Sequence, residues 1–332
     1  MKSPAPWTWI KSPSPAVGTG RNSPPRRSRF ATGEAGAPPL MAYTRAHALL
    51  FLAPLLLIVL LMYGMMAWTV AVSMDDWVGM APVWKFHGLG NFRTLLGGAL
   101  RERLFTSLRN NLIWLVVFIA PTASLGLFLA YGLDLVGRAE RVLRPLFLYP
   151  IALSFVVTGT LWAWMYDPDA GVINNLLRMI GLGRWAQPWI ADPGLATFCL
   201  IGAAVWQYTG FAMTLYLAAI RDMPREIFEA ARVDGASDVQ TFRHVVIPNV
   251  GHATMIVVAM LILVTLKVFD LVWVMTFGGP GISTEVLPFF MFVATFRQQF
   301  IGIGAAISVL ILILAVAVVV PYAWWSMRRL QA

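Results

Sequence analysis

The sequence predicts an all-α polytopic membrane protein with six transmembrane helices and a cytosolic helix-turn-helix. The 332-residue chain is 58% hydrophobic and only 12% charged, whereas soluble domains are about a quarter charged. Six apolar segments are long enough to cross a bilayer, and a polar block at residues 223–248 separates the fourth segment from the fifth. A polar block between two membrane spans must lie in water, where it can bind a partner.

Each apolar segment holds about 20 mainly apolar residues, the length that a helix needs to cross the hydrocarbon core. A helix also satisfies its own backbone hydrogen bonds, which lipid cannot do. The predicted spans are 48–73, 112–133, 143–165, 195–218, 253–277 and 303–325.

The distribution of Lys and Arg predicts the orientation of these spans. If the N-terminus is cytosolic, the cytosolic segments hold twice as many Lys and Arg residues as the outer segments, as the positive-inside rule requires. Both termini and the 223–248 block are then cytosolic. The net charge of +9 therefore reflects membrane topology, and no nucleic-acid partner is expected.

Residues 1–40 differ from the transmembrane domain at 41–332. They are basic and rich in Pro, Ser and Gly without an apolar period, which predicts disorder. They do not resemble a secretory signal, because no apolar core precedes Leu50. Met41 leaves open a later start site, in which case this tail would be absent from the mature protein.

The polar block begins with a predicted short helix. Pro224 suits the first helical turn, where its missing N–H costs nothing. The helix carries Glu229, Ala230 and Ala231, and Gly235 is the residue best able to take the left-handed conformation at its end. The chain therefore turns sharply at Gly235.

A second helix is predicted after this turn. Ser237 and Gln240 have the spacing of a capping box. Pro248 is expected to end the helix, because proline cannot continue one. Two short helices joined at one glycine predict a rigid element that can transmit movement, and not a flexible loop.

This block resembles the EAA loop in the membrane subunits of binding-protein-dependent ABC importers. Glu229-Ala230-Ala231, Asp234-Gly235-Ala236 and Ile247-Pro248 carry the resemblance together. It implies a type I ABC importer permease fold and a coupling loop, residues 221–248, on which a dimer of ABC ATPase subunits docks. Phe228 has a second interpretation, packing under its own membrane helices. The residues expected to contact the ATPase are Phe228, Glu229, Ala230, Ala231, Asp234, Gly235 and Pro248.

Outer segments extend the resemblance to carbohydrate importers, and in particular to the larger membrane subunit of maltose importers. They are 88–92 (GLGNF), 166–168 (YDP) with 171–175 (GVINN), and 276–285 (TFGGPGISTE). The family implies a second, related permease and an extracytoplasmic solute-binding protein. An ordinary external turn is the alternative for 278–280. The residues expected to contact the binding protein are Gly88, Asn91, Gly278, Gly279 and Pro280.

The chain is expected to be a transport subunit and not an enzyme. It lacks the Gly-x-x-x-x-Gly-Lys-Ser/Thr phosphate cradle, so ATP is used by a partner subunit and no cofactor is bound by this chain. Cys199 is the one cysteine and the four histidines are scattered, which predicts neither a disulfide nor a metal site.

A substrate path is expected along the fourth and fifth spans, which look like the spans lining the sugar cavity of maltose importers. Ordinary helix packing is the alternative for each of these residues. Lys267 and Asp270 are charges within a span, which are usually paired or functional, and a structural pair is favoured over a substrate contact. The candidate path residues are Gln207, Tyr208, Phe211, Leu261, Thr265, Val268 and Asp270.

The resemblance therefore implies an ATP-driven importer in a bacterial or archaeal cytoplasmic membrane. Its substrate would be an oligosaccharide, a disaccharide or a glycerol-phosphate-like solute, with a slight preference for a neutral sugar because Lys267 is the only basic residue within a span apart from Arg144 at the edge of 143–165. An ion- or proton-coupled secondary transporter is the main alternative and a membrane enzyme is another. Both leave the 223–248 block unexplained.

Overall fold

The computed structural model describes residues 45–82 and 84–331, so the prediction for residues 1–40 lies outside the described part. The chain divides into two units, residues 1–57 and 58–332. Helix α1 (Arg45–Ser73) begins in the first unit and ends in the second. Every other described helix belongs to the second unit, and no strand occurs among the described residues.

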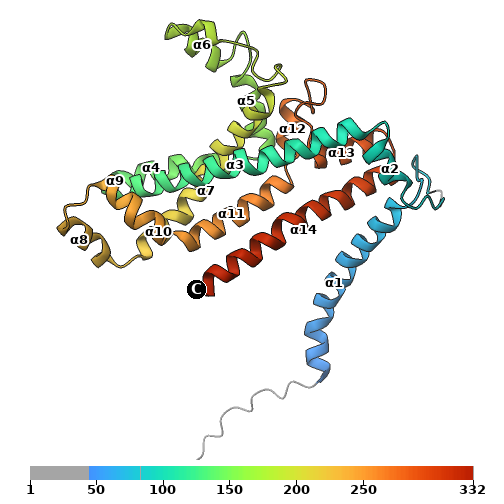
Figure 1. Ribbon diagram of the computed structural model, residues 1–332, viewed down its shortest axis with the longest axis horizontal. Coiled ribbons are helices and arrows are strands. Elements are labelled where there is room, and N and C mark those ends of the chain that lie inside the picture. Colours follow the sequence, from blue (N-terminus) through green and yellow to red (C-terminus); the bar gives the residue numbers. More distant parts are fainter. Residues whose placement is uncertain (1–44, 83, 332) are drawn as a thin grey trace, which may run out of the picture. The chain divides into compact units, whose positions relative to one another are not determined.

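The core of the second unit is built from three helices. α3 (Arg101–Leu135) packs along α7 (Ala196–Asp222), and both pack against α11 (Gly251–Leu266) (Figure 1). Gly126 of α3 lies so close to Ala212 of α7 that an added Cβ would meet the Ala212 Cβ at 2.5 Å. Small residues of this kind let helices approach closely in membranes. The contact fixes the α3–α7 crossing that carries the rest of the unit.

A second core lies at one end of the bundle. α14 (Ile301–Gln331) packs there against α13 (Leu287–Phe292) and α2 (Gly90–Gly97). Leu95, Leu104, Phe290 and Ile307 fill this second core.

Four predicted spans are continuous helices of sufficient length and apolarity, and they belong to α1, α3, α7 and α14. Two further candidate spans are bent pairs of helices, Gly137–Ala152 with Phe155–Met165 and Asp238–Asn249 with Gly251–Leu266. The described chain therefore has four continuous spans, or up to six if each bent pair counts as one. The helical content of the described residues and these candidate spans confirm the predicted all-α membrane fold class.

The predicted span 143–165 is not one straight helix. α4 (Glu140–Leu148) continues into a 3-10 turn at Tyr149–Ala152, and α5 (Phe155–Met165) then leaves at 101°. Ser154 starts α5, since its hydroxyl accepts a hydrogen bond from the Val157 N–H at 3.3 Å. A helix cap in the middle of an apolar run ends one helix and starts another.

The predicted span 253–277 is also broken. α11 ends at Leu266, and α12 (Asp270–Met275) starts after three non-helical residues. Residues 278–302, expected as an outer loop, contain a further apolar helical stretch, Leu287–Arg297. Phe289 and Phe290 are buried there, so this stretch belongs to the packed structure.

Short helices complete the second unit. α6 (Val172–Met179) lies in the connection between α5 and α7. The polar block holds α8 (Arg225–Val233), α9 (Asp238–Thr241), a π-helical turn (Phe242–Val246) and α10 (Ile247–Asn249). Figure 1 shows α8 and α9 together at one end of α3 and α7.

Candidate functional site

The predicted turn at Gly235 is present and fully hydrogen-bonded. Gly235 has φ +76°, and its N–H donates to the Arg232 carbonyl at 3.0 Å. The Ala236 N–H donates to the Ala231 carbonyl at 2.9 Å. This pair of bonds is a Schellman motif, which satisfies the last carbonyls of a helix. α8 therefore ends rigidly at the residue that the sequence indicates.

The second helix begins with the predicted capping box. Gln240 N–H donates to the Ser237 hydroxyl at 3.4 Å, and Ser237 N–H donates to the Gln240 side-chain oxygen at 2.8 Å. The Tyr131 hydroxyl of α3 donates to the Asp238 carbonyl at 3.0 Å. The Tyr131 ring packs on Phe242 with centroids 5.1 Å apart. The helix is thus fastened to α3.

The expected exit at Pro248 is wrong. Pro248 lies inside the helical run, in α10, and the chain bends by 71° only afterwards, at Val250. A π-helical turn, Phe242–Val246, directly precedes α10. Such a turn widens the helix, and the wider turn accommodates the ring that would otherwise clash with a preceding carbonyl.

The residues expected to contact an ATPase are mostly on the surface. Glu229, Ala230, Asp234, Gly235 and Pro248 are exposed, and Ala231 is half-buried. Phe228 is half-buried and packs against the main core, as its structural interpretation predicts. α8 therefore presents its polar and small residues outward and uses Phe228 as an anchor.

A polar cavity of about 660 Å³ separates α8 from the ends of α3 and α7. Arg221, at the end of α7, closes one side of it. Its guanidinium binds Glu140 at 2.6 Å and Asp134 at 3.4 Å, which ties α7 to α4 and α3. The cavity leaves part of α8 unpacked against α3 and α7. Phe228 is the α8 residue that packs on the main core.

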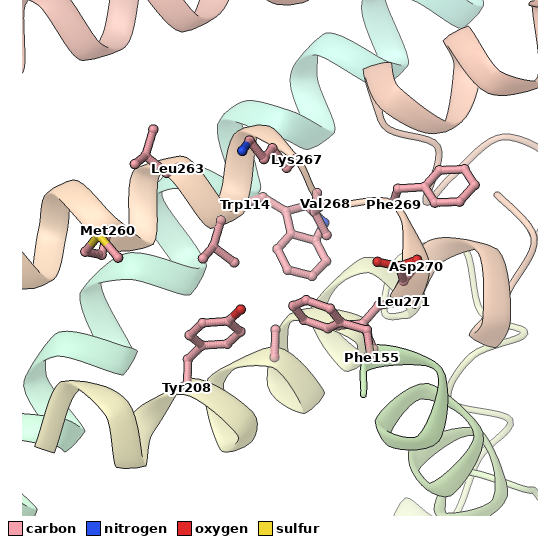
Figure 2. A pocket seen from close by; sticks show the side chains of 12 residues that line it. Trp114, Phe155, Tyr208, Met260, Leu263, Lys267, Val268, Phe269, Asp270 and Leu271 are labelled. Atoms are coloured by element: carbon pink, nitrogen blue, oxygen red, sulfur yellow. The ribbon is translucent and has the colours of Figure 1, made fainter. Parts of the chain in front are cut away.

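A second candidate site is a cavity of about 380 Å³ between α3, α5, α7, α11 and α12. Figure 2 shows aromatic side chains around it, with the Lys267 ammonium and the Asp270 carboxylate apart from one another on its wall. The aromatic wall is formed by Trp114, Phe155, Tyr208 and Phe269.

An adjoining cavity of about 320 Å³ shares Phe155, Tyr208 and Asp270 with the first. Gln207 lines it and donates to the Leu153 carbonyl at 2.8 Å. The side-chain oxygen of Gln207 and the indole N–H of Trp114 are buried and make no hydrogen bond within the described residues.

Of the residues predicted to line a path, Gln207, Tyr208, Val268 and Asp270 border these cavities. Leu261 and Thr265 do not, because they are fully buried in the core, and the Thr265 hydroxyl donates to the Leu261 carbonyl of its own helix. The opposite face of α11 lines the cavity instead. Phe211 touches Tyr208 edge-on and lies behind the cavity wall.

The favoured Lys267–Asp270 pair is not formed. The break between α11 and α12 destroys the helical i,i+3 spacing on which that expectation depended. Both side chains are exposed to the cavity, and neither has an ion-pair partner among the described residues. Trp114 and Phe155 were missed because nothing in an apolar run distinguishes a cavity wall from a core residue.

Two residues expected to contact a binding protein are buried. The Asn91 side chain donates to the Ser73 and Asp75 carbonyls at 3.0 and 2.8 Å. Gly278 has φ +84° and lies against Phe289, whose ring would be 2.7 Å from an added Cβ. Both therefore shape the segments in which they lie. Gly88, Gly279 and Pro280 are partly exposed.

A buried ion pair that the sequence did not reveal holds the 276–286 segment. Arg103 of α3 binds Glu285 through two hydrogen bonds of 2.7 and 2.5 Å, and the Glu285 side chain is 2% exposed. The Arg103 guanidinium also lies 4.4 Å from the Phe290 ring centroid. Asn110 donates to the Ser283 and Glu285 carbonyls. The segment is thereby fastened to α3.

Residues 123–327 match the family described as binding-protein-dependent transport system inner membrane component. A probable ABC transporter permease protein of Pyrococcus horikoshii is 43% identical over 85% of this chain and 96% of its own length. The xylose/arabinose import permease of Haloferax volcanii is 31% identical over 83% of this chain and 86% of its own length. The alpha-glucoside transport system permease of Rhizobium meliloti is 33% identical over 74% and 71%.

One solved structure shares the fold. The crystal structure of a bacterial ABC transporter involved in the import of the acidic polysaccharide alginate matches with a TM-score of 0.72. The match covers 85% of this chain and 94% of that chain at 20% identity. The family model covers more than half of the chain and the Pyrococcus relative spans most of it. The chain therefore belongs to the binding-protein-dependent transport system inner membrane component family, the multi-pass membrane permeases of ABC importers.

Proposed function

We propose that this permease carries a neutral carbohydrate into the cytosol past the cavity between α5, α7, α11 and α12, with α8 as the docking helix for a separate ATPase. Relatives named for xylose/arabinose and alpha-glucoside transport support a sugar substrate. An oligosaccharide, a disaccharide and a glycerol-phosphate-like solute are the substrate classes to be distinguished.

The observation that carries this proposal is the chemistry of the cavity. A sugar presents apolar C–H faces, which pack on aromatic rings such as Tyr208, and hydroxyl groups, which exchange hydrogen bonds with polar side chains. The Tyr208 hydroxyl lies at the cavity and can both donate and accept such a bond. Lys267 and Asp270 add one charge of each sign, which suits a ligand without net charge.

The rigidity of the coupling loop supports the second half of the proposal. Two ATPase subunits that close on ATP would push on α8, and a Schellman turn and a capping box transmit that movement to α9 and α3. ATP shifts the transporter between inward-open and outward-open states only if it binds one of them better. A second permease and a solute-binding protein complete this assembly.

Uptake by proteoliposomes tests the substrate. The permease is reconstituted with its co-encoded ATPase, partner permease and binding protein, and labelled pentoses, disaccharides, oligosaccharides and glycerol phosphate are supplied in turn. We expect ATP-dependent accumulation of a neutral sugar, lowered at least tenfold by Tyr208→Ala, while Tyr63→Ala, on the exposed side of α1, is unchanged. Uptake driven by a proton or sodium gradient without ATP would support the secondary-transporter alternative instead.

A pull-down tests the docking site. Gly235→Pro breaks the turn after α8, because proline cannot take φ +76°. Gly181→Pro is the matched control, since Gly181 has φ +79° with open space around it in a different connection. We expect Gly235→Pro to lose the co-encoded ATPase with normal membrane insertion and Gly181→Pro to retain it. Equal ATPase binding by both variants would exclude α8 as the docking helix.

A further inference from the structure

The connection between α5 and α7 exposes an apolar surface. It consists of Leu176, Met179, Ile180, Leu182 and Trp185, which we name the apolar ledge. Met179 is 82% exposed, Ile180 65% and Trp185 58%. Leu176, Met179 and Ile180 have i, i+3 and i+4 spacing and so share one face of α6. A contiguous exposed apolar surface of this kind marks an interaction site.

The ledge is held in place by the opposite face of α6. Asn174 is 1% exposed, and its amide donates to the Pro168 and Gln187 carbonyls, both at 3.0 Å. Its oxygen accepts from the Trp189 indole at 2.7 Å. One buried amide therefore joins both ends of the connection to α6. The rest of the connection packs against the face of α6 that carries Asn174, which leaves the ledge on the opposite face exposed.

Two arginines belong to the same connection as the ledge. They are the charged residues of the segment 176–191, and the nearest acidic residues are Asp169 and Asp192. Arg178 donates to the Pro168 and Asp169 carbonyls at 3.0 and 3.4 Å, on the side of α6 that also carries Asn174. Arg184 lies 5.9 Å from the Trp185 ring centroid. Arg184 is thus next to an exposed apolar side chain, and Arg178 lies on the polar side of α6.

We propose that α6 and the turn after it lie in a membrane–water interface, with the ledge in the acyl boundary and the two arginines among lipid phosphates. Short amphipathic helices with basic and apolar faces bind membranes in this way, and tryptophan is enriched at this level. Figure 1 shows α6 beyond the end of α5. Trp189 and Ile190, near the end of the connection, pack on the core to which α5 and α7 also contribute. The connection is therefore anchored to the bundle shortly before α7 begins.

This anchoring acts on the substrate cavity through α5. α5 is only 11 residues long, with Phe155 in the cavity wall at its first residue and the α6 connection after its last. Lipid contact at α6 would thus hold the far end of the helix that carries Phe155. The inference does not depend on the identity of the substrate.

Spin labels on single cysteines test the proposal. Cys199 is the one cysteine of the chain, so Cys199→Ala gives a cysteine-free background. Met179→Cys and Ile180→Cys place labels on the ledge. Ala170→Cys is the matched control, because Ala170 is also exposed in this connection but lies beside Asp167 and Asp169. The transporter is reconstituted in phosphatidylethanolamine and phosphatidylglycerol vesicles, and relaxation by oxygen and by a water-soluble nickel chelate is measured.

We expect the ratio of oxygen to nickel accessibility to be severalfold higher at both ledge positions than at residue 170. A ratio equal to that at residue 170 would mean that the ledge faces water and would overturn the proposal. Protection from both relaxing agents in the absence of binding protein would mean that another protein subunit covers it. Protection that appears only on addition of the binding protein would make the ledge a docking site for that protein. Either of these two results also overturns the proposal.

Discussion

Glu285 illustrates what a single side chain decides in this permease. Its carboxylate is buried, is held by two hydrogen bonds from Arg103, and fastens the segment after α12 to the beginning of α3. A buried charge is tolerated only when it is paired and hydrogen-bonded. The pair therefore positions α12 and α13, which border the substrate cavity and the second core.

We predict that Glu285→Ala lowers the free energy of unfolding by about 3 kcal/mol, because removal of one partner leaves the other charge buried. Thermal unfolding in detergent measures this as a lowered Tm. Arg101→Ala is the control, since Arg101 is exposed on the same helix and its guanidinium lies over the Phe105 ring. A Tm for Glu285→Ala equal to that of the control would show that the pair contributes nothing.

Asp270 is the other residue whose charge has a specific expected effect. We predict that Asp270→Asn lowers sugar uptake about tenfold, since a hydrogen bond to a charged group contributes about 1.5–3 kcal/mol and 1.4 kcal/mol is a factor of ten. Initial uptake rates in proteoliposomes measure it. Asp222→Asn, at the exposed end of α7, should transport normally. Unchanged uptake and substrate affinity in Asp270→Asn would remove Asp270 from the path.

At the scale of elements, the two broken spans build the cavity that we propose as the substrate path. The break between α4 and α5 places Phe155 at a helix start, and the break between α11 and α12 exposes Lys267 and Asp270. Straight helices would have packed these side chains into lipid or into the core. Non-helical backbone at membrane depth is tolerated where it borders a cavity, and these breaks satisfy that condition.

The attachment of α9 to α3 gives a prediction about coupling. Tyr131→Phe removes the hydrogen bond to the Asp238 carbonyl, which contributes about 0.5–1.5 kcal/mol, and keeps the ring contact with Phe242. We expect substrate-stimulated ATP hydrolysis by the reconstituted transporter to fall severalfold while ATPase binding in a pull-down stays normal. Tyr149→Phe is the control, since Tyr149 is exposed. Full stimulation in Tyr131→Phe would show that movement reaches the membrane helices by another route.

At the scale of the whole molecule, the predicted topology places α8 and α6 on opposite sides of the membrane. In the Cys199→Ala background, Val239→Cys places a thiol on the exposed surface of α9, within the coupling loop, and Ala170→Cys places one near the start of α6. We expect an impermeant maleimide to label residue 170 in intact cells and residue 239 only after permeabilisation. The reverse pattern would invert the orientation derived from Lys and Arg. Labelling of both residues in intact cells would contradict the span count.

Local signals in the sequence were sufficient for the coupling loop. A positive-φ glycine and a capping box each act through bonds between residues less than six positions apart, so the α8 end, the turn and the α9 start could be predicted. The exit at Pro248 could not, because the π-helical turn before it changes what a proline does to a helix. Length and apolarity likewise predicted where spans occur but not whether they are straight.

The sequence by itself determined the family, the membrane character, the two-helix form of the 223–248 block and four of the residues that border the cavities, Gln207, Tyr208, Val268 and Asp270. Only the tertiary structure decided which face of α11 meets the cavity, that Lys267 and Asp270 stay apart, and that Arg103 binds Glu285 across 182 positions. Burial and charge pairing depend on which helices are neighbours. In a chain whose spans are apolar all round, periodicity does not reveal those neighbours.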